Sequence, residues 1–152
     1  MSHKMSRREE RELALRGIFQ LDFHDNEADR DVSIAKFLEL AGQGDPEDEV
    51  TGETTGYARQ IIDAVIANQA EVDALIKKYL KQDWEFSRVP KSEKAILRLG
   101  TAELLYLNIP KEIAINEAVE LAKKYAELES KGYINGILNQ IAQNHVHDGQ
   151  DQ

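Results

Sequence analysis

The amino-acid sequence predicts an all-α protein of about seven helices. Apolar residues recur at helical spacing through most of the 152-residue chain, and no segment is a convincing strand. Hydrophobic residues make up 41% of the chain and charged residues 31%, which suits a helix-rich protein with an ordinary core. Helical periodicity and composition therefore agree on the fold class.

The N-terminal part of the chain is expected to contain three helices. Apolar stripes predict the first over about residues 7–23, the second over about 31–40 and the third over about 54–68. Residues 42–52 separate the last two and contain three Gly, one Pro and four acidic residues. That composition predicts an exposed loop.

Four further helices are expected in the C-terminal part. The fourth takes up the apolar residues between 72 and 80, and the sixth and seventh span about 114–126 and 130–143. The fifth starts at Pro90, because the first turn of a helix does not need the missing N–H. It is apolar on most of its surface, so it should be the central, buried helix.

Short connections favour antiparallel neighbours, so the helices are predicted to form two packed helical subdomains within a single domain. We place the N-terminal subdomain at about residues 1–68 and the C-terminal subdomain at about 69–143. Residues 144–152 are polar and are predicted to be a frayed tail.

The negative charge of the chain is concentrated in one segment. Of the net charge of −9, residues 22–53 supply eleven acidic and two basic residues, whereas residues 1–21 carry five basic and three acidic ones. Since salt limits surface charge effects to about 10 Å, a basic patch elsewhere can still bind an anionic partner.

Several classes of function are disfavoured. The chain has no Cys, which excludes disulfides and thiolate metal sites and favours the cytoplasm, and no apolar run approaches the ~20 residues of a membrane span. Glu117 and Glu120 lie one helical turn apart, and paired carboxylates can act in acid–base catalysis. An exposed face with ion pairs explains that spacing better. The histidines are too scattered for a triad or a metal site, so we expect no enzyme, metal or cofactor: His3, His24, His145 and His147.

A cluster of basic residues opens the chain. Arg7 and Arg11 share a helix face, Arg8 lies beside them, and Lys4 precedes them on the N-terminal arm. Such a cluster can contact a phosphate backbone and stack on unpaired bases. Because glutamates are interleaved with the arginines, a solvated helix face is the alternative interpretation.

The last predicted helix contains an unusual stretch, YINGILNQ, which begins at Tyr133. Ser130 is a plausible N-cap, and Tyr133 beside Lys131 is an aromatic ring next to positive charge, as in single-strand binding proteins. Asn135-Gly136 is a weak pair for a helix interior. We therefore predict that Gly136 marks a close crossing with another helix.

Three stretches of the chain, in order and covering most of its length, resemble the NusB family of bacterial transcription antitermination factors. They are RREERELALRGIFQLDF, VPKSEKAILRLGTAELLYLNIPKEIAINEAVELAKKY and ESKGYINGILNQIA. The resemblance implies an all-α protein of two helical subdomains that binds RNA and is not an enzyme. It also implies that the protein binds the boxA element with ribosomal protein S10 (NusE). Other Nus factors and RNA polymerase would then join in antitermination, notably on ribosomal RNA operons. No contact with DNA or membranes is expected.

The resemblance also implies particular site residues. Glu93 matches an acidic position near the face that meets S10, and Arg98 and Glu103 are expected to extend that face. The boxA surface is expected to include residues from the N-terminus and from the start of the last helix: Lys4, Arg7, Arg8, Arg11, Glu129, Ser130, Lys131, Tyr133 and Asn135.

Two alternatives remain. The acidity of the chain favours a helical protein-interaction adaptor without direct RNA binding. A NusB-like domain also occurs fused to RNA methyltransferases, but this chain lacks the βαβ pattern of a cofactor-binding domain.

Overall fold

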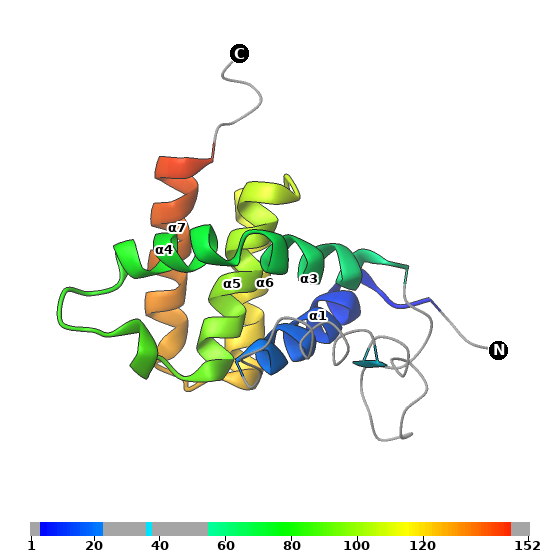
Figure 1. The fold of residues 1–152 in the computed structure, drawn as a ribbon, viewed down its shortest axis with the longest axis horizontal. Helices are drawn as coiled ribbons and strands as arrows, with labels where there is room; N and C mark the ends of the chain where they lie inside the picture. Colours follow the sequence, from blue (N-terminus) through cyan, green and yellow to red (C-terminus); the bar gives the residue numbers. More distant parts are fainter. Residues whose placement is uncertain (1–3, 23–35, 38–54, 147–152) are drawn as a thin grey trace, which may run out of the picture. The chain divides into compact units, whose positions relative to one another are not determined.

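The computed structural model describes residues 4–22, 36–37 and 55–146 (Figure 1). The elements found in these residues are helices, which confirms the all-α prediction. They are α1 (Arg7–Leu21), α3 (Tyr57–Ala67), α4 (Gln69–Tyr79), a 3₁₀ turn (Phe86–Arg88), α5 (Lys91–Tyr106), α6 (Lys111–Tyr125) and α7 (Ser130–His145). Among these helices none is both long enough and apolar enough to cross a membrane.

Some predicted features lie outside the described residues. The second predicted helix, 31–40, lies almost entirely there, and so does the predicted loop 42–52. Most of the acidic segment 22–53 and residues 147–152 of the tail also lie outside.

Two prolines mark the starts of helices. Pro90 precedes α5 with extended backbone (φ −55°, ψ 143°), and Pro110 precedes α6 in nearly the same conformation (φ −53°, ψ 139°). Proline suits this position because the first N–H groups of a helix have no partner within it. Helix α6 therefore starts at Lys111, three residues before the predicted start at 114.

The chain divides into two units, Met1–Asp63 and Ala64–Gln152. The boundary falls within α3, a few residues before the predicted limit at residue 68. In the first unit, α1 packs closely on α3 because Gly17 has no side chain: a Cβ at Gly17 would lie 2.8 Å from Ile62 Cδ1.

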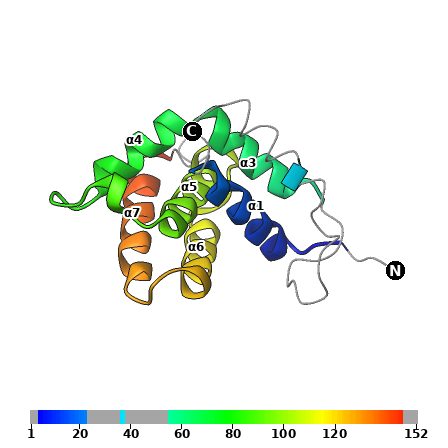
Figure 2. The ribbon, with the colours of Figure 1, turned by 60° about the horizontal axis from the view of Figure 1, so that its bottom comes forward.

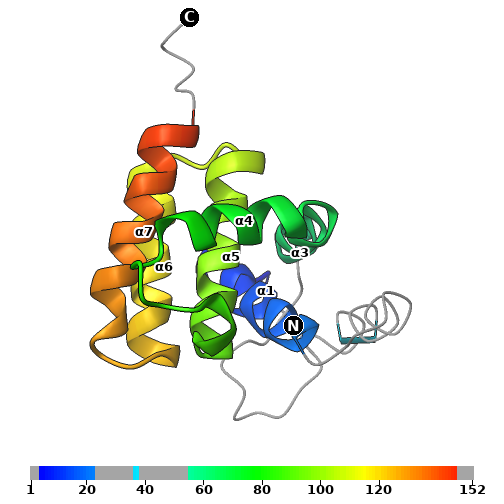
Figure 3. The same ribbon diagram turned by 60° about the vertical axis from the view of Figure 1, so that its left-hand side comes forward.

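In the second unit, α5, α6 and α7 pack against one another in pairs, and α4 packs on α5 and α7. Figures 1 and 3 show α4 lying across α5 and α7, and Figure 2 shows α6 and α7 side by side. Every residue of α5 from Glu93 to Leu104 is buried. The prediction of a central, buried fifth helix is therefore confirmed.

Glycine allows one close helix contact in this unit, though not at the predicted position. A Cβ at Gly100 of α5 would lie 2.8 Å from Leu138 Cδ1 of α7, too close for an unshifted side chain. Gly136 is exposed, and a Cβ there would meet no atom within 4 Å. The prediction that Gly136 marks a close crossing is wrong, because the Asn135-Gly136 pair lies on the outer face of α7.

Candidate functional site

The basic N-terminus is held in a defined helix start. Ser6 Oγ accepts a hydrogen bond from the Glu9 backbone N–H (3.1 Å), and Glu9 Oε1 accepts one from the Ser6 N–H (2.8 Å). This reciprocal capping box satisfies two N–H groups that the helix itself leaves unpaired. One of the interleaved glutamates thus has a structural role in starting α1.

A second glutamate of this segment joins α1 to the start of α3. Glu10 is only 1% exposed, and its carboxylate accepts hydrogen bonds from the Thr55 N–H (2.5 Å), the Thr55 hydroxyl (2.9 Å) and the Ala58 N–H (3.0 Å). A carboxylate is favoured there because the N-terminus of a helix carries partial positive charge. Sequence reasoning missed this role because Thr55 lies 45 residues further along the chain.

The arginines of α1 gather around one aromatic ring. The Arg7 guanidinium lies 3.8 Å from the centre of the Tyr57 ring, and that of Arg11 lies 5.8 Å from it. Arg7, Arg8 and Lys4 are exposed, whereas Arg11 is 4% exposed. Arg7 and Arg11 therefore share a face, as their spacing predicts, but Arg11 is buried and does not present its guanidinium to solvent.

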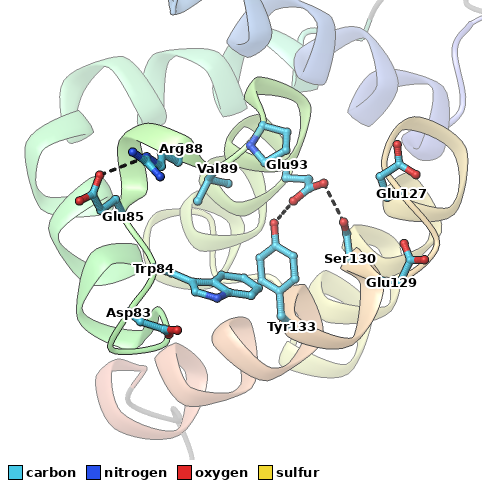
Figure 4. A pocket seen from close by; sticks show the side chains of 11 residues that line it. Asp83, Trp84, Glu85, Arg88, Val89, Glu93, Glu127, Glu129, Ser130 and Tyr133 are labelled. Carbon is cyan, nitrogen blue, oxygen red and sulfur yellow. Dashed lines mark hydrogen bonds and ion pairs between the residues drawn. The ribbon is translucent and has the colours of Figure 1, made fainter.

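The start of α7 is fixed by a buried carboxylate on α5. Glu93, 4% exposed, accepts hydrogen bonds from the Ser130 hydroxyl (2.7 Å) and from the Tyr133 hydroxyl (Figure 4). Ser130 was predicted to be the N-cap, but it is the first residue of α7, its side chain bonds to Glu93, and Glu129 is the N-cap. Glu93 thus sets the position of the Tyr133 ring.

The Tyr133 ring borders a hollow of about 540 Å³ beside the start of α7 (Figure 4). Trp84 meets it edge to face, with ring centres 5.0 Å apart and planes at 81°. One cation, Arg88, lines the hollow and lies 3.5 Å from Glu85. Five carboxylates also line it: Asp83, Glu85, Glu93, Glu127 and Glu129. We call this hollow the acidic pocket.

The other residues predicted near the start of α7 do not line the acidic pocket. Lys131 is half-buried. Asn135 is exposed, and its backbone carbonyl accepts a hydrogen bond from the Asn139 side chain (3.0 Å). The predicted residues of this helix therefore divide into a pocket group and an outer-surface group.

Two residues predicted to extend the S10 face are buried. Arg98 is 3% exposed and donates two hydrogen bonds to Asp73, at 2.8 and 2.9 Å. Glu103 is fully buried within α5. Because both side chains are buried, neither is presented at the surface for a partner.

The sequence interpretation missed two aromatic residues of these sites. Tyr57 lies under the arginines of α1, and Trp84 is 40% exposed beside Tyr133. Trp84 could have been noticed in the sequence, because it lies in a polar segment that breaks the helical pattern. A large aromatic residue in such a segment is a candidate for contact with another part of the protein or with a partner.

Comparison with known proteins identifies a family that matches most of the chain. The NusB family model matches residues 8–143. The transcription antitermination protein NusB of Listeria innocua is 37% identical over 139 residues, which covers 91% of this chain and 97% of the relative.

Solved structures agree with that match. The T. maritima NusB structure superposes with a TM-score of 0.75 at 33% identity, covering 95% of this chain and 96% of that one. A crystal structure of the antitermination factors NusB and NusE in complex with dsRNA matches with a TM-score of 0.72, covering 91% of this chain and 97% of that one. At 24% identity, the second match shows a common fold.

Proposed function

Since this chain belongs to the NusB family of transcription antitermination proteins, we propose that it binds boxA RNA together with ribosomal protein S10 (NusE). In this proposal it acts with other Nus factors on RNA polymerase, notably on ribosomal RNA operons, and catalyses no reaction. The observation that carries the proposal is the family match over residues 8–143. The solved complex of NusB and NusE with dsRNA supports the choice of partners.

The exposed cations of the N-terminus form the proposed RNA backbone contact. Lys4, Arg7 and Arg8 are exposed, and cations at the surface can replace the counterions of RNA phosphates. Arg11 is buried against Tyr57, so we assign it a positioning role, in which it helps to fix the ring below Arg7. Glu9 and Glu10 do not prevent this contact, because their carboxylates are engaged at helix starts.

The acidic pocket is proposed to accept a group other than a phosphate. Five carboxylates and one arginine line it, which repels a phosphate but attracts hydrogen-bond donors and cations. Donor edges of an unpaired base stacked on Tyr133, or a basic side chain of S10 beside Glu93, both fit this chemistry. Ser130 then positions Glu93, whereas Glu129 borders the bound group.

Lys131 and Asn135 are proposed to contact RNA outside the pocket. Both lie in the first two turns of α7, near Tyr133, and Asn135 is exposed. An amide and an ammonium there can bind sugar, phosphate or base edges next to the stacked base.

Fluorescence anisotropy tests the proposal with a short boxA RNA and a scrambled RNA at near-physiological salt, each with and without S10. Selective binding of boxA that becomes tighter with S10 is the expected result. An equal affinity for both RNAs, with S10 present, contradicts it.

The acidic pocket also favours one second candidate, a protein-interaction adaptor that binds a basic partner and no RNA. Salt dependence separates the two candidates. RNA binding through phosphates gives a steep fall of affinity with salt, with a slope of about −0.7 per contact for single strands. An adaptor alone gives no measurable RNA affinity at any salt concentration.

A further inference from the structure

The segment from residue 77 to residue 98 includes the end of α4, the connection to α5 and the first half of α5. Its net positive charge is larger than that of the N-terminus. Residues 77–98 contain seven basic and three acidic residues, against five and three in residues 1–21. Arg98 is buried and paired with Asp73, which lies outside this segment, so the other six basic and three acidic residues leave an excess of three positive charges. In a chain with a net charge of −9, this local excess is a candidate surface for an anionic partner.

Three cations of this segment converge on the Phe86 ring. The Lys94 and Lys77 ammonium groups lie 4.8 and 5.4 Å from its centre, and the Arg98 guanidinium lies 5.5 Å from it. Asp73 balances the charge of Arg98 through two hydrogen bonds. Lys77 and Lys94 remain as two like charges on one ring, and an anion between them would lower their mutual repulsion.

A hollow of about 560 Å³ lies over this cluster. Its lining includes Lys77, Lys94, Phe86 and Trp84, and we call it the basic pocket. Lys94 is 9% exposed, and Glu85 is the one carboxylate in the lining. Trp84 also lines the acidic pocket, so one exposed ring borders both hollows. The Lys81 ammonium lies 5.2 Å from the centre of the Trp84 ring, which adds a cation next to that ring.

We propose that the basic pocket binds single-stranded RNA, with one phosphate between Lys77 and Lys94, the neighbouring phosphate at Lys81 and an unpaired base against Trp84. The proposal rests on the RNA-binding function proposed above and extends the RNA path from Tyr133 over the α4–α5 connection. Cations beside an exposed aromatic ring suit nucleic acid, because a base offers a face to stack while its phosphate meets a cation. An acidic peptide would use the cations and leave the Trp84 face unused.

The test compares two double variants with equal changes of charge. Lys77→Gln with Lys81→Gln removes two exposed ammonium groups of the proposed path, and Lys111→Gln with Lys124→Gln removes two exposed ones on α6. Anisotropy gives the affinity for a boxA RNA with a single-stranded extension, with S10 present, over a range of salt concentrations. The fluorescence of Trp84, the one tryptophan of the chain, reports contact with the base.

The proposal predicts that the first double variant reduces the salt slope by about 1.4, which corresponds to about 25-fold weaker binding at 0.1 M salt. The control pair should leave the slope within error of wild type, and RNA should quench Trp84 emission in the wild-type protein. A wild-type slope in the first variant, or unchanged Trp84 emission while RNA binds, overturns the basic pocket and leaves the proposed function standing.

Two further outcomes also overturn the inference. If an oligoglutamate peptide quenches Trp84 emission as strongly as the RNA does, the surface binds an acidic protein segment instead. If the wild-type protein with S10 binds no RNA at all, the proposed function and this inference fail together.

Discussion

Substituting two glycines on facing helices tests the packing of α5 against α7. Gly100→Ala and Gly136→Ala each add one methyl group to a helix, and each gains the ~0.5–1 kcal/mol by which Ala exceeds Gly in helix propensity. The surroundings differ, because the new Cβ lies 2.8 Å from buried Leu138 at position 100 and in open space at position 136. The difference between the two variants therefore isolates the cost of crowding.

The expected magnitude follows from this geometry. The three atoms nearest to a Cβ at Gly100 all belong to Leu138, at 2.8, 3.1 and 3.5 Å, and overpacking of this kind costs about 1–3 kcal/mol. Gly136→Ala should raise the free energy of unfolding by ~0.5–1 kcal/mol. Gly100→Ala should then be less stable than Gly136→Ala by about 1–3 kcal/mol.

Urea unfolding gives both values, and each kcal/mol corresponds to about 2–4 °C in Tm for a chain of this size. Leu138→Ala is a third variant, which removes the side chain that a methyl group at position 100 would crowd. In the double variant Gly100→Ala with Leu138→Ala, the new methyl group occupies space that the leucine side chain has left. The double variant should be more stable than the sum of the two single changes predicts. Equal stabilities of Gly100→Ala and Gly136→Ala would show that a methyl group at position 100 does not crowd Leu138.

Three further predictions concern polar groups that are buried or partly buried. Glu10→Ala should lower the free energy of unfolding by about 2–4 kcal/mol, since it removes a charged acceptor from the start of α3, and urea unfolding measures it. Tyr133→Phe should lower the free energy of unfolding by about 1–3 kcal/mol, because the hydrogen bond to Glu93 is lost, and should keep the affinity for RNA. Tyr133→Ala should also weaken RNA binding by about 1–3 kcal/mol, because the stacking ring is lost. Unfolding curves measure the first effect and anisotropy measures the second. Burial, together with the nearby Glu71 carboxylate, raises the pKa of Tyr106 to about 12. Because an unfolded tyrosine ionises near pH 10, the free energy of unfolding should fall as the pH rises from about 10 through about 12. Tyr106→Phe should remove that part of the pH dependence.

Contradicting results for these three are specific. An unchanged unfolding midpoint in Glu10→Ala would show that the carboxylate does not stabilise the start of α3. Equal RNA affinity of Tyr133→Ala and wild type would exclude stacking on that ring. A phenolate absorbance titration in which all tyrosines ionise near pH 10 would contradict the assignment to Tyr106.

Helix content and the buried central helix could be predicted from the sequence because both depend on local periodicity. The apolar pattern of α5 extends around most of the helix, and burial from Glu93 to Leu104 follows from it. The shared face of Arg7 and Arg11 is equally local, since residues four apart on a helix are neighbours.

The rest depended on contacts between distant residues. Gly100 and Gly136 both lie inside a helical pattern, and the close contact falls at Gly100 because Leu138 packs against it and not against Gly136. The sequence alone suggests that Arg98 is a surface cation. In the structure it is buried and forms an ion pair with Asp73, 25 residues away in the sequence. Ser130 has the local chemistry of an N-cap, but Glu93 on another helix competes for its hydroxyl.

The proposed function is tested most directly by a binding cycle of this chain with S10 and boxA RNA at one salt concentration. If both partners bind one cooperative unit, S10 should increase RNA affinity, and RNA should increase S10 affinity by the same factor, since coupling free energies are reciprocal. We expect a factor above one with boxA RNA and no such increase with a scrambled RNA. A factor of one for boxA, or the same factor for both RNAs, would contradict it.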